Sequence, residues 1–103
     1  MVPILVTSTA PSQEVASLIA KELVSKRLAA CVNIVPVNSY YEWQGKVENE
    51  HEFKLFIKSI SDHFNQICAE IKEKHPYDVP EILQLNITNG SSSYLSWLDD
   101  AIS

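Results

Sequence analysis

The pattern of apolar and polar residues along the chain predicts alternating extended and helical segments. Residues 2–9 begin with an apolar, β-branched run, which is typical of a mostly buried strand. Pro11 and Ser12 then open a segment in which apolar residues recur at helical spacing. These apolar residues are Val15, Leu18, Ile19 and Leu23. The chain is therefore expected to begin with a strand followed by an amphipathic helix.

A long hairpin is predicted in the middle of the chain. From Ala30 an extended pattern runs to Trp43, and Gln44-Gly45 turns the chain. The return strand alternates between an apolar and a charged face. The apolar face carries Val47, His51, Phe53, Leu55 and Ile57, and the charged face carries Glu48, Glu50, Glu52 and Lys54. Pro36 cannot donate to a β-ladder, so the outgoing strand is expected at a sheet edge or a bulge.

The last part of the chain is predicted to hold a helix, a strand and a final helix. Ser61 is the expected N-cap of the first of these helices. His75-Pro76 ends it, because the residue before a proline avoids the helical region. Its apolar stripe is Phe64, Ile67, Cys68 and Ile71, and the final helix presents Tyr94, Leu95, Trp97, Leu98 and Ile102. The strand between the two helices is expected over residues 82–88.

The order of these elements defines the fold class. Two helices on one face of a four-stranded antiparallel sheet form the ferredoxin-like βαββαβ sandwich, an α+β fold. We expect a single domain over residues 1–103, with an extended hairpin between the second and third strands and an added C-terminal helix. The hairpin strands exceed the usual ~5–6 residues. The hairpin also carries aromatic side chains that the rest of one chain is too small to bury, namely Tyr40, Tyr41 and Trp43. A second copy of the chain is the simplest partner that could bury them, so self-assembly is predicted.

The charge balance excludes several classes of partner. Thirteen acidic residues against eight basic ones give a net charge of −5, and the basic residues do not cluster. Binding phosphates requires a basic face, so neither nucleic acid nor an anionic membrane surface is an expected partner. No apolar run approaches the ~20 residues needed to span a bilayer. The first residues lack the basic region of a signal peptide, so we expect a cytoplasmic protein.

Motifs for catalysis or metal binding are sparse. The sequence has no G-x-S-x-G, H-E-x-x-H or C-x-x-C pattern. Cys31 and Cys68 stand among apolar residues, and we expect both to be reduced and buried. The acidic residues Glu48, Glu50 and Glu52 could bind a hard cation, but a solvated face that discourages edge pairing is the favoured interpretation. His75 precedes a loop that contains Glu81, and its residue context leaves a binding role and a helix-capping role open.

Several ordered motifs, which together extend over nearly the whole chain, carry a resemblance to a known family. Residues 41–46 (Tyr-Glu-Trp-Gln-Gly-Lys) resemble a Y-x-W-x-G-K hairpin, and residues 75–81 (His-Pro-Tyr-Asp-Val-Pro-Glu) resemble an H-P-Y-x-x-P-E loop. Residues 94–97 resemble a Y-L-x-W helix, and residues 26–31 (Lys-Arg-Leu-Ala-Ala-Cys) resemble the entry into the second strand. By these motifs the sequence is similar to the CutA divalent-cation tolerance family.

The resemblance implies a tight homotrimer with a role in tolerance to copper and other divalent metals. It implies no enzymatic activity, and it makes Cu(II) or another divalent cation the expected ligand. The alternative is a PII-like trimeric module for small-ligand binding, signalling or anchoring, without a physiological metal. The candidates for its inter-subunit cleft are Trp43, Lys58, Glu81, Tyr94 and Trp97.

The resemblance also implies where a copper ion would bind. The site of bacterial members uses a Cys at the end of the first strand and two consecutive His before Pro-Tyr. The matching positions here are Ser8, Lys74 and His75. A hydroxyl is a poor replacement for a thiolate and a protonated Lys is not a ligand, so His75 is the single expected metal ligand.

Two other classes of protein share this topology, but the sequence lacks the residues that their functions need. Acylphosphatases need an Arg in the loop after the first strand, which here reads Ser8-Thr9-Ala10-Pro11-Ser12. RNA-binding domains of this topology stack bases on aromatic side chains, and the first strand has none.

Overall fold

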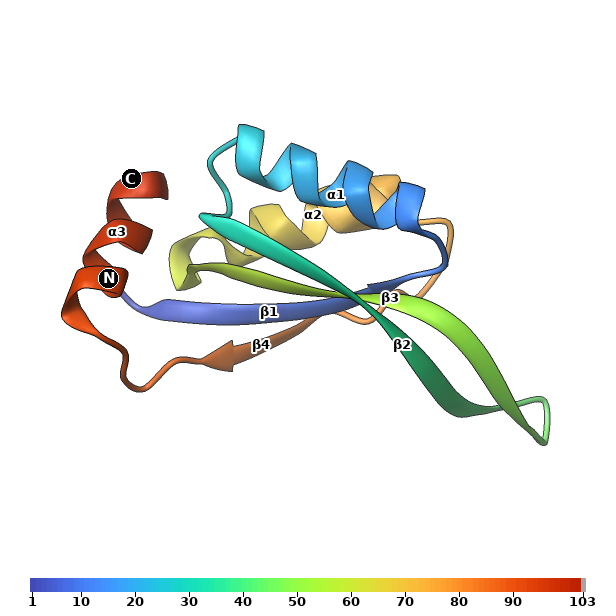
Figure 1. The fold of residues 1–103 in the computed structure, drawn as a ribbon. Helices are drawn as coiled ribbons and strands as arrows, with labels where there is room; N and C mark the ends of the chain where they lie inside the picture. Colours follow the sequence, from blue (N-terminus) through green and yellow to red (C-terminus); the bar gives the residue numbers. More distant parts are fainter. Residues whose placement is uncertain (103) are drawn as a thin grey trace.

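The computed structural model of the protein describes residues 1–102, and its elements follow the predicted order (Figure 1). The elements are β1 (Pro3–Ala10), α1 (Gln13–Ser25), β2 (Cys31–Trp43), β3 (Lys46–Ile60), the 3-10 turn η1 (Ser61–His63), α2 (Phe64–Lys74), β4 (Leu83–Asn86) and α3 (Ser92–Ile102). The strands pair in the order β2-β3-β1-β4, and every pairing is antiparallel. The ferredoxin-like α+β sandwich is therefore confirmed. Ser103, the last residue of the predicted domain, lies outside the described residues.

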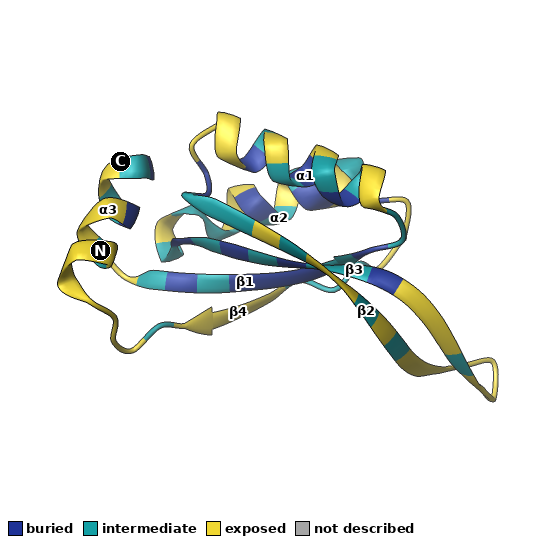
Figure 2. Cartoon of the chain, viewed as in Figure 1, coloured by how far each residue is buried: buried dark blue, intermediate teal, exposed yellow. Residues whose placement is uncertain are grey.

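The hydrophobic core lies between the sheet and the two helices that cover one of its faces. α1 and α2 lie on the same side of the sheet, and Figure 2 shows buried residues along the surfaces that meet there. The fully buried apolar residues of this layer are Ile4, Val6, Ala10, Ala16, Ile19, Leu23, Leu55, Ile57, Ile67 and Ile71. Burying one such large side chain contributes about 1.5–3 kcal/mol, so this layer stabilises the fold of the chain.

The helices differ from the sequence-based prediction at three positions. α1 begins after Pro11 and Ser12 as expected, and Ser12 caps it, since its Oγ accepts a hydrogen bond from the Val15 N–H at 3.2 Å. Leu18, however, is 47% exposed, and Ala16 takes its expected place in the buried stripe with Ile19 and Leu23. The prediction of Ser61 as an N-cap was wrong, because residues 61–63 form η1 and α2 begins after it without a side-chain cap.

The cysteines were also expected to be more deeply buried than they are. Cys31 and Cys68 are both free thiols and only half-buried. Cys31 is the first residue of the edge strand β2, and Cys68 follows the fully buried Ile67 in α2.

The hairpin projects beyond the rest of the sheet as an arm, which we define as residues 37–52 (Figure 1). β1 pairs with β3 only from Phe53 to Ile60, so the arm consists of β2 and β3 alone. Its turn has Gln44 at φ 52° and Gly45 at φ 79°, and positive φ at both positions suits the twist of a two-residue hairpin. Pro36 lies in the edge strand β2, as predicted.

Candidate functional site

A cleft of about 780 Å³ opens between the arm and the loop that joins α2 to β4. Its lining residues share two chemical characters, since most are acidic or aromatic. They are Thr9, Tyr41, Trp43, Glu48, Glu50, Glu52, Tyr77, Asp78, Val79 and Glu81. No Lys, Arg or His is among these lining residues of the described chain, so the walls of the cleft are strongly acidic.

Strand pairing explains how the arm supplies one wall of the cleft. Tyr41 pairs with Glu48 across the β2–β3 ladder, so the two side chains lie on the same face. Alternate residues of a strand share a face, which adds Trp43 from β2 and both Glu50 and Glu52 from β3. The sequence-based prediction that the three glutamates share one face is consistent with this register.

Two tyrosines donate hydrogen bonds to the glutamates of this wall. Tyr41 Oη donates to Glu50 Oε1 at 2.5 Å, and Tyr77 Oη donates to Glu52 Oε2 at 3.2 Å. The bond to Glu50 raises the pKa of Tyr41 to about 12, and burial together with the nearby Glu52 charge raises the pKa of Tyr77 to about 12. Both phenols therefore remain protonated donors near neutral pH. Glu52 is only 7% exposed, so the interpretation of the acidic face as solvated was wrong for this residue, which the loop covers.

Glu81 is the one carboxylate of the cleft that has a basic partner in the described chain. Lys54 Nζ lies 2.7 Å from Glu81 Oε2, and Thr7 Oγ1 donates to the same oxygen at 3.1 Å. These contacts fasten the end of the loop to β1 and β3. Within residues 1–102, Glu48, Glu50 and Asp78 have no Lys or Arg partner at ion-pair distance, so the cleft keeps an excess of negative charge.

His75 is buried behind the cleft, and both of its ring nitrogens contact the backbone. Nδ1 accepts a hydrogen bond from the Tyr77 N–H at 3.1 Å, so Nε2 carries the proton and donates to the Thr9 carbonyl at 2.6 Å. The ring also lies 4.7 Å from the Tyr77 ring, between centroids. This neutral imidazole holds the loop against the end of β1. Coordination of a metal ion would have to replace one of the two bonds, and the expected role of His75 as a ligand stays a prediction.

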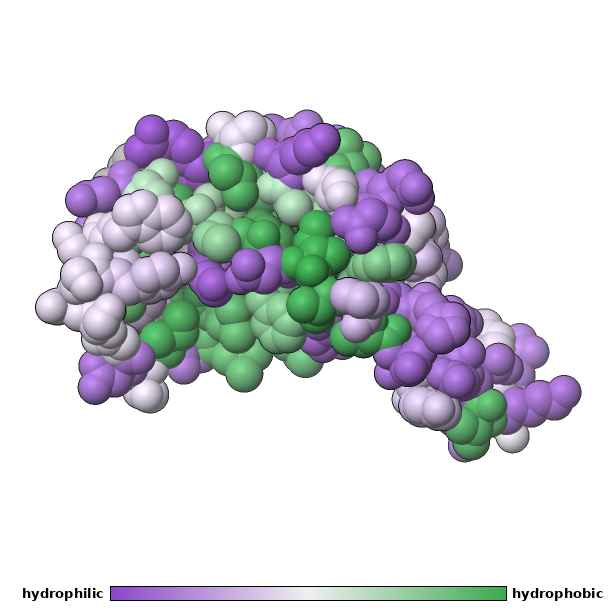
Figure 3. Space-filling view, in the orientation of Figure 1, coloured by the Kyte–Doolittle hydropathy of each residue, from purple (hydrophilic) through white to green (hydrophobic). Residues whose placement is uncertain are grey.

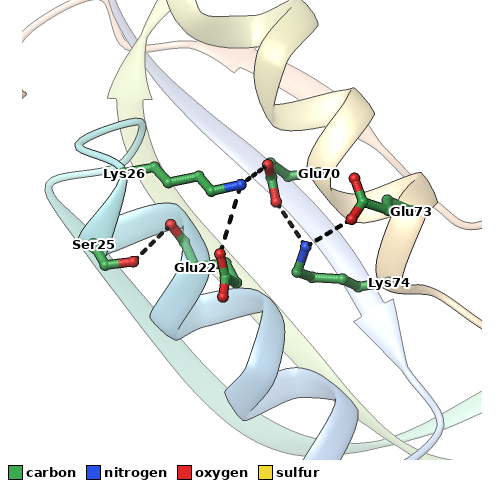
Figure 4. A network of polar contacts seen from close by, with 6 residues as sticks. All are labelled: Glu22, Ser25, Lys26, Glu70, Glu73 and Lys74. Carbon is green, nitrogen blue, oxygen red and sulfur yellow. Dashed lines mark hydrogen bonds and ion pairs between the residues drawn. The ribbon is translucent and has the colours of Figure 1, made fainter.

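The other two residues of the expected copper site, Ser8 and Lys74, have surroundings different from those of His75. Ser8 is fully buried, and its Oγ has no hydrogen-bond partner among the described residues. Lys74 Nζ lies 3.0 Å from Glu70 and 3.4 Å from Glu73, in a network with Lys26 and Glu22 between α1 and α2 (Figure 4). The hydrogen bond to Glu70 raises the pKa of Lys74, which keeps it charged. Over residues 1–102, no three side chains of His, Cys, Asp and Glu come together in a group that could hold a metal ion.

The five residues expected in an inter-subunit cleft fall into two groups within one chain. Trp43 and Glu81 line the cleft at the arm. Lys58, Tyr94 and Trp97 form a separate cluster, in which Lys58 Nζ lies 5.9 Å from the centroid of the Tyr94 ring and the two aromatic rings are 5.4 Å apart. The inter-subunit cleft that would unite them stays a prediction.

Sequence reasoning missed Tyr41, Tyr77 and Asp78 as lining residues of the cleft. All three stand inside the motifs that carried the family resemblance, which was the available signal. These residues lie on the arm and on the loop between α2 and β4, which are far apart in sequence and come together only in the folded chain.

The antiparallel ferredoxin-like sandwich, the projecting arm and the acidic cleft define the class of this chain. Residues 4–101 match the family model of the CutA1 divalent ion tolerance protein, and the chain belongs to this family. The chain is 50% identical over 91 residues to the divalent-cation tolerance protein CutA of Thermus thermophilus, covering 87% of this chain and 88% of the relative. It is 43% identical over 94 residues to the Archaeoglobus fulgidus protein of the same name, covering 91% and 92%.

Solved structures agree with this family assignment. The CutA structure from Archaeoglobus fulgidus has a TM-score of 0.95 at 40% identity, covering 98% of this chain and 99% of that one. CutA1 from Oryza sativa has a TM-score of 0.96 at 38% identity, covering 100% and 95%. The family is named for tolerance to divalent cations and not for a catalytic activity.

One of these structures corrects the expected cytoplasmic location. The Archaeoglobus fulgidus protein is described as a periplasmic divalent cation tolerance protein, which points away from the cytoplasm. The expectation rested on composition and on the first residues of the chain, and neither property determines a compartment. As for membranes, none of the helices within residues 1–102 has the length and apolar character needed to cross one.

Proposed function

We propose that the chain acts in divalent-cation tolerance as a homotrimer that binds Cu(II) or another divalent cation. The observation that carries the cation part is the acidic cleft at the arm. Glu48, Glu50 and Asp78 line it without a basic partner in the described chain, so a cation that enters meets uncompensated negative charge. Carboxylate oxygens are ligands for divalent cations, and Cu(II) accepts both oxygen and nitrogen donors.

The apolar surface of the protomer supports the homotrimer. On the arm, Tyr40 is 70% exposed and Trp43 is 60% exposed. On β4, Leu83 and Leu85 are 56% and 49% exposed, and they pair with β1 residues on the sheet face opposite the helices. Hydrophobic residues gather over the middle of the molecule in Figure 3, while hydrophilic residues cover much of the arm. Apolar surface of this extent marks a protein interface, and a second copy is the occupant we propose.

Calorimetric titration of chelator-stripped protein with copper and zinc salts tests the cation part. We expect Glu50→Gln to weaken binding by about tenfold, which corresponds to about 1.4 kcal/mol, because the carboxamide keeps the shape and removes the charge. The control is Glu14→Gln on the exposed first turn of α1, which should bind as wild type does. Equal affinities for wild type and Glu50→Gln would contradict a cation site in this cleft.

Light scattering on a size-exclusion column tests the assembly. We expect the mass of a trimer over a dilution series that reaches micromolar concentration, because association buries the aromatic residues that are exposed on the arm. A monomer peak at that concentration would contradict the homotrimer.

A second function is favoured by the Lys58–Tyr94–Trp97 cluster. A cation beside two aromatic rings suits a small anionic ligand between protomers, in the manner of the PII-like alternative. A thermal-shift screen of anionic metabolites in metal-free buffer separates the two functions, since stabilisation there would not require a divalent cation.

A further inference from the structure

The segment between β4 and α3 contains the one Asn-Gly pair of the sequence, Asn89-Gly90. Residues 87–91 belong to no helix or strand, and they run as a loop at the end of the sheet that lies opposite the arm (Figure 1). Asn89 and Gly90 are both exposed. They follow the last residue of β4, so they lie outside the arm and outside the β4 residues that we assign to the proposed homotrimer.

The side chain of Asn89 folds back onto the peptide bond that follows it. The Gly90 N–H donates a hydrogen bond to Asn89 Oδ1 at 2.9 Å. Asn side chains often bond to the backbone just ahead of them in this way. Because Oδ1 is bonded to Cγ, the contact holds the amide carbon of the side chain close to the Gly90 nitrogen. A bond between these two atoms closes a succinimide ring.

Gly90 leaves its nitrogen open to this ring closure. Glycine has no Cβ beside its nitrogen, and its backbone adopts conformations that other residues avoid. A Cβ added at Gly90 would lie 3.3 Å from the Leu95 side chain, which is a tight contact, so the packing of the loop against α3 favours glycine here. The packing that selects glycine at this position therefore also keeps the nitrogen unshielded.

We propose that Asn89-Gly90 is a site of self-modification, in which Asn89 converts to isoaspartate and loosens the start of α3. The Gly90 nitrogen gives up its proton and bonds to Asn89 Cγ, while the bond from Cγ to the side-chain nitrogen breaks and that nitrogen leaves with the proton as ammonia. Water then opens the succinimide at one of its two carbonyls, which gives aspartate or isoaspartate. In isoaspartate the main chain passes through Cγ, and the α-carboxylate stands free as a new negative charge.

The product changes the backbone immediately before the cap of α3. Ser91 Oγ accepts a hydrogen bond from the Tyr94 N–H at 3.3 Å, and the Ser91 carbonyl accepts one from the Leu95 N–H at 3.0 Å. Isoaspartate lengthens the main chain by a methylene group, which moves Gly90 against Leu95 and Ser91 away from these amides. The first turn of α3 then loses its capping hydrogen bonds.

The test is to age the full chain for weeks at mildly alkaline pH, to digest it at mildly acidic pH and to map the peptides by mass spectrometry. We expect Asn89 to gain the mass that accompanies replacement of an amide by a carboxylate, with an equal amount of ammonia released. A protein isoaspartyl methyltransferase with labelled S-adenosylmethionine measures the isoaspartate. The rate should rise with pH, because ring closure needs the deprotonated nitrogen. An unmodified Asn89 after ageing would overturn the proposal.

Asn86 is a matched control within the same segment. It precedes Ile87, whose side chain shields its nitrogen and whose N–H already donates to the Pro3 carbonyl at 3.1 Å. Asn86 should therefore react at least about tenfold more slowly than Asn89. Equal rates at the two asparagines would overturn the proposal, because they would show that neither the glycine nor the contact in the loop directs the reaction.

Two variants test the chemistry of ring closure. Asn89→Gln keeps the amide but has to close a larger ring, as does Gln44-Gly45 at the tip of the arm, so neither should react measurably. Gly90→Ala places a methyl group beside the nitrogen and should slow the reaction by about tenfold or more. Circular dichroism confirms that each variant is folded before it is aged. Release of ammonia from Asn89→Gln at the wild-type rate would overturn the proposal.

Hydrogen exchange tests the effect on α3. In the converted protein the amides of Tyr94 and Leu95 should exchange at least about tenfold faster than in fresh protein, whereas those of Ile19 and Leu23 in α1 should be unchanged. Asn89→Gln aged in parallel should keep the exchange pattern of fresh protein. Unchanged exchange at Tyr94 and Leu95 in fully converted protein would overturn the proposed loosening of α3.

Discussion

Apolar and polar residues alternate along both ends of β3, but the apolar face is buried at one end and exposed at the other. In residues 53–60 the strand lies between β1 and β2 and under the helices, and Leu55 and Ile57 are fully buried. In residues 46–52 it pairs with β2 alone, and Val47, which continues the same apolar series, is 77% exposed. Alternation therefore determines which side chains share a face, but the neighbouring elements determine whether that face is covered.

The largest expected effect comes from truncating the covered end of the strand. Leu55→Ala should lower the free energy of unfolding by about 2–5 kcal/mol, because it leaves a cavity between the sheet and the helices. Val47→Ala on the arm should change it by less than about 0.5 kcal/mol. Urea unfolding at one fixed protein concentration measures both. Similar losses for the two variants would mean that the arm is as well covered as the core within the protomer.

The proposed homotrimer should depend on the uncovered end of β3 and on the β2 residues that pair with it. Trp43→Ala should weaken association by about 2–4 kcal/mol, as expected for a buried aromatic at the centre of an interface, while the secondary structure of the protomer stays unchanged. Sedimentation equilibrium measures the association, and circular dichroism measures the fold. Leu18→Ala on the exposed side of α1 is the control and should associate as wild type does. Normal association of Trp43→Ala would place the interface away from the tip of the arm.

His75 connects the two regions, since it joins the loop of the cleft to the end of β1. His75→Ala should lower the free energy of unfolding by about 1–3 kcal/mol, because the Thr9 carbonyl and the Tyr77 N–H both lose a partner. His51→Ala on the exposed arm should have no measurable effect. Thermal melting compares the variants.

The same variant tests the expected role of His75 in metal binding. Because both ring nitrogens contact the backbone, we expect His75→Ala to titrate with copper as wild type does. Loss of copper binding from a folded His75→Ala protein would instead support the sequence-based expectation that His75 is a ligand.

The smallest expected effect is a pH dependence of the cleft. Tyr41 and Tyr77 have pKa values near 12 in the folded chain, above the usual value of 10.0. Since folding disfavours the phenolate, the stabilisation is complete below about pH 10 and is lost as the pH rises toward 12. Phenolate absorbance should show two late-titrating tyrosines, and Tyr41→Phe and Tyr77→Phe should each remove one. A late titration that both variants retain would assign the shift to other tyrosines.

The amino-acid sequence determined the local features and the family. The periodicity of α1 and β3, the turn at Gln44-Gly45 and the end of α2 before Pro76 were all predictable, because each depends on residues that are neighbours in the chain. The motifs at residues 41–46 and 75–81 led to the CutA family, which the comparisons confirmed. They identified the segments that form the cleft without indicating how these segments meet.

The tertiary structure alone decided the chemistry of the cleft. Glu52 is buried because Tyr77 reaches it across 25 positions of sequence, and Glu81 is held by Thr7 across 74. The same packing turned both nitrogens of His75 toward the backbone and separated Trp43 from the Lys58–Tyr94–Trp97 cluster. Such contacts depend on how whole elements pack together. Local periodicity does not predict these contacts, because it describes one helix or strand at a time.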